Sequence, residues 1–139
     1  MSSSAIESPV GADDPPSKVR AILLFGHGAK NPEWAAPFVA IRDAILKRDS
    51  STLVESGFLE LMRPSFAEAV DLLVTRGATQ IVVVPIFMAA GVHIRKDLPQ
   101  LAAQAMDRHP NLEITLAPPV GESPEVIATM ANYAQSVWR

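Results

Sequence analysis

The sequence predicts an α/β fold in which a four-stranded parallel sheet carries helices on both faces, and three observations predict it. Short apolar runs alternate with segments whose apolar residues recur every three or four positions, in the order βαβαβαβα. This alternation is typical of parallel sheets with right-handed crossovers. The 139 residues, 48% of them hydrophobic, suffice for one core. No linker interrupts residues 19–139, so we expect one domain there, preceded by a flexible tail over residues 1–18.

The first half of the domain contains two strand–helix units. Residues 21–25 (AILLF) form a strand candidate of the kind that is buried on both faces. Apolar residues at helical spacing then predict a helix over residues 33–47. Residues 53–61 are the second strand candidate. Pro64 can open the next helix at its first turn, and Gly77 lies just past the end of that helix.

The second half repeats the pattern. Residues 81–87 (IVVVPIF) are the most β-rich run in the chain and predict the third strand. A helix is expected over residues 98–108, with Asp97 as its N-terminal cap. Residues 113–116 predict the fourth strand. Apolar residues at helical spacing predict a last helix over residues 126–137.

Composition and motifs exclude several classes of function. The net charge is −3 and no basic run occurs, which argues against nucleic-acid binding. No segment approaches the ~18 apolar residues of a membrane span. The absence of cysteine excludes disulfides and thiolate metal sites, and it fits a cytoplasmic location. The chain also lacks a Gly-x-Ser-x-Gly motif and a Gly-rich phosphate loop. A metal would therefore be held by histidine and carboxylate ligands.

Two of the three histidines fall in loops that follow predicted strands, where parallel α/β sheets bind their ligands. His27 lies between two glycines directly after the first strand, and His93 follows the third strand after a run of small residues. Each alone also fits a structural histidine in a turn. Together, at one rim, they suit a divalent metal with open coordination positions. His109, at the end of a helix and on the other side of the sheet, is interpreted as structural.

Charged residues in the same loops leave alternatives open. Glu60, amid apolar residues near the end of the second strand, either completes a metal site or pairs with a neighbouring base. Arg63, Arg95 and Lys96 suit an anionic ligand, but such charges are also typical of ordinary solvated surface. A phosphoester hydrolase that uses His27 is disfavoured, because the arginine expected before that histidine is a glycine.

Five stretches in register resemble the small sirohydrochlorin chelatases of the CbiX/SirB type. Each stretch is weak alone, but together they span residues 20–125. They are LLFGHGA (23–29), FLELMRP (58–64), GATQIVVVP (77–85), GVHIRKDLP (91–99) and LAPPVG (116–121). The chain departs from the family pattern at two positions. Ala29 stands where members often have Ser, and Arg63 stands where many have Glu.

The resemblance implies a chelatase fold with strand order 2-1-3-4, which brings the loops after the first and third strands side by side. It implies a homodimer, because larger chelatases carry two such lobes in one chain. It also implies that His27 and His93 bind metal and that His27 and Glu60 act in catalysis. The substrate-contacting residues expected from the resemblance and the rim charge are Met88, Ala89, Ala90, Gly91, Val92, His93, Arg63 and Arg95.

On this resemblance we expect an enzyme that inserts a divalent metal into sirohydrochlorin for cobalamin or siroheme biosynthesis. Cobalt is the expected metal, with iron or nickel as alternatives, and no organic cofactor is expected. His27 would accept a pyrrole proton, His93 would be the second metal ligand, and Glu60 would assist by ligation or by taking a proton. The alternative is a non-catalytic metal or tetrapyrrole carrier on the same fold, which would bind stoichiometrically without turnover.

Overall fold

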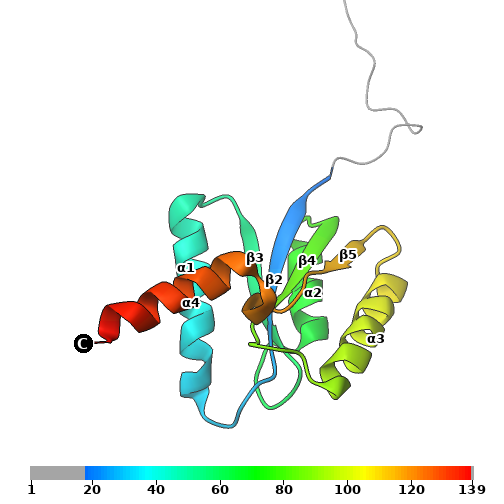
Figure 1. The fold of residues 1–139 in the computed structure, drawn as a ribbon. Coiled ribbons are helices and arrows are strands. Elements are labelled where there is room, and N and C mark those ends of the chain that lie inside the picture. Colours follow the sequence, from blue (N-terminus) through cyan, green and yellow to red (C-terminus); the bar gives the residue numbers. More distant parts are fainter. Residues whose placement is uncertain (1–17, 139) are drawn as a thin grey trace, which may run out of the picture.

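The computed structural model describes residues 18–138 as a sheet of four parallel strands between two layers of helices (Figure 1). Nearly all of the expected tail over residues 1–18 lies outside the described residues. The strands are β2 (Arg20–Gly26), β3 (Leu53–Phe58), β4 (Gln80–Pro85) and β5 (Glu113–Leu116). Their order in the sheet is β3-β2-β4-β5, with every neighbouring pair parallel. This is the expected 2-1-3-4 order, so the predicted fold class is confirmed.

Helices lie on both faces of the sheet (Figure 1). The helical elements are η1 (Pro32–Ala35), α1 (Ala36–Arg48), α2 (Phe66–Thr75), α3 (Val92–Arg108), η2 (Val120–Glu122) and α4 (Pro124–Val137), where η denotes a short 3₁₀ helix. Because β3 and β4 flank β2 on opposite sides, right-handed crossovers place α1 on the face opposite α2 and α3. In Figure 1, α4 returns to the face that carries α1.

The hydrophobic core lies between the sheet and the α2–α3 layer. Alternate side chains of β2 and β4 point into it and are completely or almost completely buried. Phe25 sits at its centre, with edge-to-face contacts to Phe66 at 5.8 Å and to Phe87 at 5.9 Å between ring centroids. Each fully buried side chain of this size contributes about 1.5–3 kcal/mol. This layer therefore fixes the strand ends that carry the loops.

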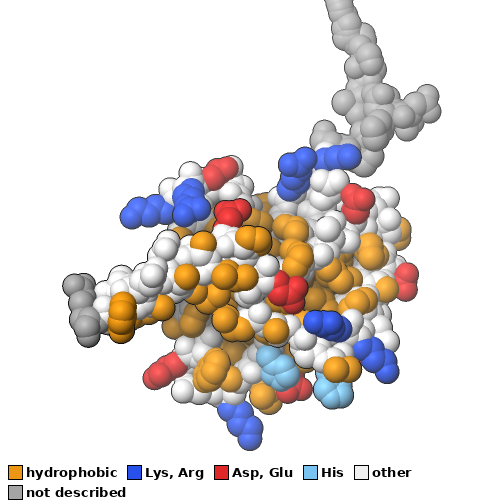
Figure 2. Space-filling view, in the orientation of Figure 1, with side chains coloured by type: hydrophobic (Ala, Val, Ile, Leu, Met, Phe, Trp, Pro, Cys, Tyr) orange, Lys and Arg blue, Asp and Glu red, His pale blue; other side chains and the backbone are white. Residues whose placement is uncertain are grey.

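The opposite face of the sheet is covered sparsely. Neither α1 nor α4 contains a buried residue, and Ile22, Val82 and Val84 of the sheet are only half-buried. Figure 2 shows hydrophobic side chains gathered along α4 and in the area beside it. A large exposed apolar surface of this kind is often an interaction site.

The second strand is shorter than the sequence predicts. It ends at Phe58 rather than at residue 61, because Leu61 adopts a positive φ of 66° that an extended strand does not allow. Pro64 precedes α2 instead of opening it. Ser65 is the cap, and its side chain and that of Glu68 form a reciprocal capping box. The Ser-x-x-Glu spacing of such a box is visible in the sequence.

The third helix begins at Val92, well before the expected residue 98, and β4 ends at Pro85 rather than at residue 87. Asp97 is therefore inside the helix and does not cap it. Pro99 also lies inside and removes one backbone hydrogen bond. The same helix buries Leu98 and Ala102, which offsets that loss. The connection after β4 is thus short, and His93 lies in the first helical turn. Within residues 18–138, no helix is long and apolar enough to cross a membrane.

Candidate functional site

His27 and Glu60 are brought together by backbone pairing beyond the ends of two neighbouring strands. The amide of Leu59 donates to the carbonyl of Gly26 at 3.0 Å, and the amide of Glu60 donates to the carbonyl of His27 at 3.1 Å. These bonds continue the β2–β3 ladder into the loops. The side chains that follow each strand are therefore adjacent by construction of the sheet.

The two side chains form an accessible polar pair. Nε2 of His27 lies 3.2 Å from Oε2 of Glu60, and each side chain is 56% exposed. Nε2 donates to Oε2 in the tautomer that carries its hydrogen on that nitrogen. An imidazole nitrogen and a carboxylate oxygen are both suitable ligands for divalent transition metals. The two groups side by side also form a short route for a proton.

Gly28 permits this close approach. It has a φ of 99°, and a Cβ built on it would lie 1.8 Å from the carbonyl oxygen of Glu60. On the other loop, Leu61 has its positive φ and the amide of Met62 turns back to the carbonyl of Glu60 at 2.8 Å. Glu60 is thus held between a glycine and a tight turn, which fixes its position relative to His27.

An apolar hollow of about 250 Å³ opens beside His27. Phe38 and Phe58 meet edge to face in it, with centroids 5.0 Å apart. A Cβ on Gly26 would lie 2.4 Å from the Phe38 ring, so the glycine lets that ring pack against the end of the strand. The other side chains that line the hollow include Trp34, Met62 and Phe87. An apolar chamber with a few polar groups at its edge is typical of small-molecule sites.

The loop after β4 reaches the same edge of the sheet. Met88 is 66% exposed at its tip. Gly121 packs against the backbone of this loop. Its amide donates to the Phe87 carbonyl at 2.9 Å, and a Cβ there would lie 2.0 Å from the Met88 carbonyl oxygen. Nε of Arg95 donates to the carbonyl of Ala90 at 3.3 Å. The expected substrate loop therefore has fixed supports at both ends.

His93 lies at the same edge of the sheet as His27 and Glu60 but does not pair with them. Because β2 and β4 are adjacent and parallel, the first turn of α3 lies at the same edge as His27, and Figure 2 shows histidine side chains at the lower rim beside hydrophobic ones. Among residues 18–138, His93 makes no hydrogen bond or ion pair with His27 or Glu60. No group of three potential metal-ligating side chains forms within that range. The two-histidine metal site remains a prediction.

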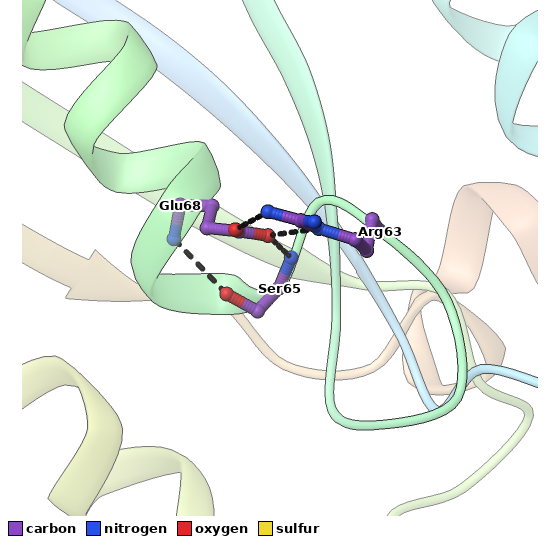
Figure 3. Close-up of polar contacts among 3 residues, drawn as sticks. All are labelled: Arg63, Ser65 and Glu68. Atoms are coloured by element: carbon purple, nitrogen blue, oxygen red, sulfur yellow. Dashed lines mark hydrogen bonds and ion pairs between the residues drawn. The ribbon is translucent and has the colours of Figure 1, made fainter.

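Arg63, expected among the substrate contacts, pairs with a residue of the helix that follows its loop. Its guanidinium binds both carboxylate oxygens of Glu68 at the start of α2 (Figure 3), with Nε at 3.2 Å from Oε1. Glu68 in turn accepts the amide of Ser65. Arg63 lines a separate hollow with Asp71 and Leu72, whereas Met62 is the residue of this segment that lines the hollow beside His27. Arg95 and Lys96 are exposed on α3.

The Arg63–Glu68 pair gives a pH-dependent contribution to stability. The hydrogen bond from Arg63 and that from the Ser65 amide lower the pKa of Glu68 from 4.5 to about 2. A lowered carboxyl pKa stabilises the folded state above pH 4.5, and that contribution is lost as the pH falls towards 2. Arg63→Met should therefore lower the melting temperature near neutral pH, and the difference from wild type should shrink as the pH approaches 2. Melting curves followed by circular dichroism across this range measure it. If the difference in melting temperature between wild type and Arg63→Met is the same at every pH, the Arg63–Glu68 ion pair does not make this contribution.

His109 is confirmed as a residue outside the site. It ends α3 and binds Asp71 of α2, with Nε2 at 2.8 Å from Oδ1. The hydrogen bond from His109 holds the pKa of Asp71 below its ordinary value. The residues around His109 include Thr79, just before β4, so it lies at the opposite end of the sheet from His27.

Three residues that contribute to the site could not be predicted from the sequence. Trp34 and Phe38 flank the hollow, and Gly121 supports the Met88 loop. Trp34 sits in a short 3₁₀ helix that has no periodic signal, and Phe38 fits a core position of a helix equally well. Gly121 belongs to one of the stretches that carry the family resemblance, but its partner is about thirty residues away in sequence. Only the folded structure relates them.

Comparison with known proteins identifies one family. The CbiX family model matches residues 21–137. A protein of Saccharolobus solfataricus named sirohydrochlorin cobaltochelatase is 41% identical over 106 residues, which cover 72% of this chain and 81% of that protein. One of the same name from Sulfurisphaera tokodaii is 35% identical over 118 residues, covering 85% and 93%.

Two solved structures share the fold. One is a CbiX protein from Marinobacter aquaeolei whose description assigns it to cobalamin biosynthesis. It superposes with a TM-score of 0.74 at 27% identity, and the match covers 85% of this chain and 96% of that protein. The sirohydrochlorin chelatase SirB from Bacillus subtilis, solved with cobalt, has a TM-score of 0.72 at 29% identity. The match covers 87% of this chain but 51% of SirB.

Proposed function

Because this chain belongs to the CbiX family, we propose that it is an enzyme that inserts a divalent metal, cobalt in the first place, into sirohydrochlorin. The observation that carries the proposal is the exposed His27–Glu60 pair at the edge of an apolar hollow. The pair can receive both a metal and a proton, and the hollow can receive part of a large, flat, mainly apolar ring. The names of the relatives and the cobalt-bound SirB support the choice of metal.

Insertion exchanges two pyrrole N–H protons for one divalent cation. His27 accepts the two protons one after the other and releases the first before it takes the second, because imidazole is the side chain that exchanges protons most readily near neutral pH. Glu60, 3.2 Å away, passes the proton to solvent or acts as a metal ligand. His93 supplies a second nitrogen ligand from the first turn of α3. Few protein ligands leave coordination positions open, which lets the metal leave for the macrocycle.

Sirohydrochlorin carries many carboxylates, and the rim of the site carries cations. Arg95 and Lys96 are exposed on α3 and can bind these carboxylates by charge-assisted hydrogen bonds. The substrate contacts that we assign to the loop after β4 are those of Met88, Ala89, Ala90, Gly91, Val92 and His93. Arg63 pairs with Glu68 but remains exposed, and it stays a predicted substrate contact.

The test is the change in visible absorbance when metal enters sirohydrochlorin, measured with and without the protein and with the uncatalysed rate subtracted. Cobalt should be inserted faster with the protein, and iron and nickel in parallel reactions rank the alternatives. If no metal reacts faster with the protein than without it, the carrier alternative replaces the enzyme.

A cytoplasmic location stays a prediction of the sequence.

A homodimer is the second part of this proposal. The match to SirB uses half of that chain, so a second copy of this chain would supply the other half. The sparsely covered face has the apolar surface that such a contact needs: Ile127 is 48% exposed, Tyr133 69% and Trp138 81%. A second copy seated there would bury α4, which contains no buried residue in the single chain.

A charge placed on α4 should separate the dimer. Wild type should be a dimer at micromolar concentration by light scattering, and Tyr133→Glu should be a monomer, because an unpaired carboxylate is costly to bury. Leu72→Glu is the matched control, since Leu72 is an exposed apolar residue on α2, on the opposite face. It should remain a dimer. A monomeric wild type, or a dimeric Tyr133→Glu, would contradict the proposed interface.

A further inference from the structure

Trp34 is an exposed aromatic side chain on the hollow beside His27. It lines that hollow together with Phe38 and Phe87, yet its side chain is 65% exposed. Tryptophan has the largest apolar surface of any side chain, and leaving most of it in water forgoes much of the free energy that its burial would yield. None of the groups assigned above to metal binding or proton transfer needs an indole. The position of Trp34 beside these groups therefore needs a separate explanation.

The backbone that carries Trp34 is held in place. Trp34 lies in η1, which Asn31 caps: the Asn31 side chain accepts the amide of Glu33 at 2.9 Å, and its carbonyl accepts the amide of Trp34 at 3.1 Å. The chain continues directly into α1, whose Phe38 packs on Gly26 at the end of β2. The indole is thus presented from a fixed support, on the side of the hollow formed by α1.

The chemistry of the hollow selects the class of ligand that fits against the indole. Its lining is mainly apolar and rich in aromatic rings, with His27 as the polar group at the edge. A bare metal ion or a small anion gains little from such walls. A flat conjugated ring gains both burial and stacking, because aromatic faces attract one another in offset arrangements beyond the effect of area alone.

We propose that Trp34 is a specificity-determining residue that stacks on a face of the tetrapyrrole and holds it over His27. This inference rests on the proposed function and adds to it a residue for recognition of the ring. Trp34 takes no part in proton transfer or in metal ligation. Its loss should therefore weaken macrocycle binding and leave metal binding as it is.

Four variants test the proposal: Trp34→Phe, Trp34→Leu, Trp34→Ala and, as control, Leu72→Ala on the opposite face. The binding of metal-free sirohydrochlorin is titrated by absorbance, and cobalt binding without sirohydrochlorin is titrated by calorimetry. Trp34→Ala should bind sirohydrochlorin about tenfold more weakly or worse. Trp34→Leu should lie close to it, because leucine keeps apolar volume without a stacking face. Trp34→Phe and Leu72→Ala should stay near wild type, and all variants should bind cobalt as wild type does.

The rate data separate recognition from a structural role. KM for sirohydrochlorin should rise in Trp34→Ala and Trp34→Leu while kcat changes much less. Sirohydrochlorin affinity equal to wild type in both variants would overturn the role of Trp34 and leave the proposed function standing. So would a parallel loss of cobalt binding, which would indicate a general disturbance of the site. A wild-type protein that neither binds sirohydrochlorin nor inserts metal would overturn the proposed function and this inference together.

Discussion

His27→Ala is expected to remove most of the chelatase turnover, by a factor of ~10² or more, the usual cost of losing a general base. His27 is the only side chain assigned both to metal ligation and to proton acceptance. The variant loses the imidazole that accepts the pyrrole proton, so Glu60, 3.2 Å from Nε2 of His27 in the wild type, no longer receives the proton from it. The side chain is exposed, and its removal should leave the fold intact. The initial rate of absorbance change with cobalt and sirohydrochlorin measures the effect.

The other two histidines are matched controls. His93→Ala should mainly weaken metal binding, so a higher cobalt concentration should partly restore its rate, whereas His27→Ala should not recover. His109→Ala should keep wild-type activity, because His109 binds Asp71 at the opposite end of the sheet. A folded His27→Ala protein with wild-type turnover would show that the proposed chemistry is wrong.

Gly28→Ala is expected to cause the second large effect, on stability and activity together. An alanine at a φ of 99° is strained by about 1–2 kcal/mol. Its Cβ would also lie 1.8 Å from the Glu60 carbonyl oxygen, so the two loops must separate. That movement breaks the bond from the Glu60 amide to the His27 carbonyl, which adds about 1 kcal/mol. Because Glu60 moves away from His27, turnover should fall more than the loss of folded protein explains.

Gly77→Ala isolates the part of this effect that comes from the positive φ, without the steric contact. Gly77 has nearly the same φ, 102°, but nothing lies within 4 Å of an added Cβ. It should lose only the stability that the positive φ accounts for and keep full activity. Chemical denaturation of both variants gives the two free energies of unfolding. Equal losses in the two proteins, with normal turnover in Gly28→Ala, would show that the close approach of the loops does not position the site.

The sheet and the neighbours of His27 could be predicted from local patterns. Apolar runs of strand length marked all four strands, and the order of the sheet followed from the family resemblance. Glu60 was expected near the end of its strand, and parallel pairing of β2 and β3 brings it to His27. The strands and the approach of Glu60 to His27 depend on residues close in sequence and on one rule of sheet geometry, whereas the order of the strands required the resemblance.

Features that depend on competition between interactions could not be predicted. Pro99 and Asp97 indicate a helix start, but the helix extends through them to Val92, and Ile94 in this added part packs against the core. Arg63 was expected to face an anionic ligand, and its pairing with Glu68 in the first turn of α2 was not predicted. A pattern identifies which residues can pair, but the distances that choose one partner over another arise only after folding.

The same holds for the partners of glycines. Gly121 looks like an ordinary turn glycine in the sequence, and its contact with the Met88 carbonyl depends on how the segments that follow β4 and β5 fold onto each other. Gly28 is easier, because its place directly after a histidine and two residues past the end of a strand already indicates a tight turn. Contacts between loops that are distant in the sequence are the part of the site that requires the structure.

The most direct measurement of the central claim is the amount of metallated product formed per chain when sirohydrochlorin and cobalt are in large excess over the protein. A chelatase built on His27 and Glu60 should form many equivalents of product per chain, at a rate proportional to protein concentration and above the uncatalysed reaction. Product that stops at about one equivalent per chain, or a rate independent of the protein, would contradict the account and assign the fold to a carrier.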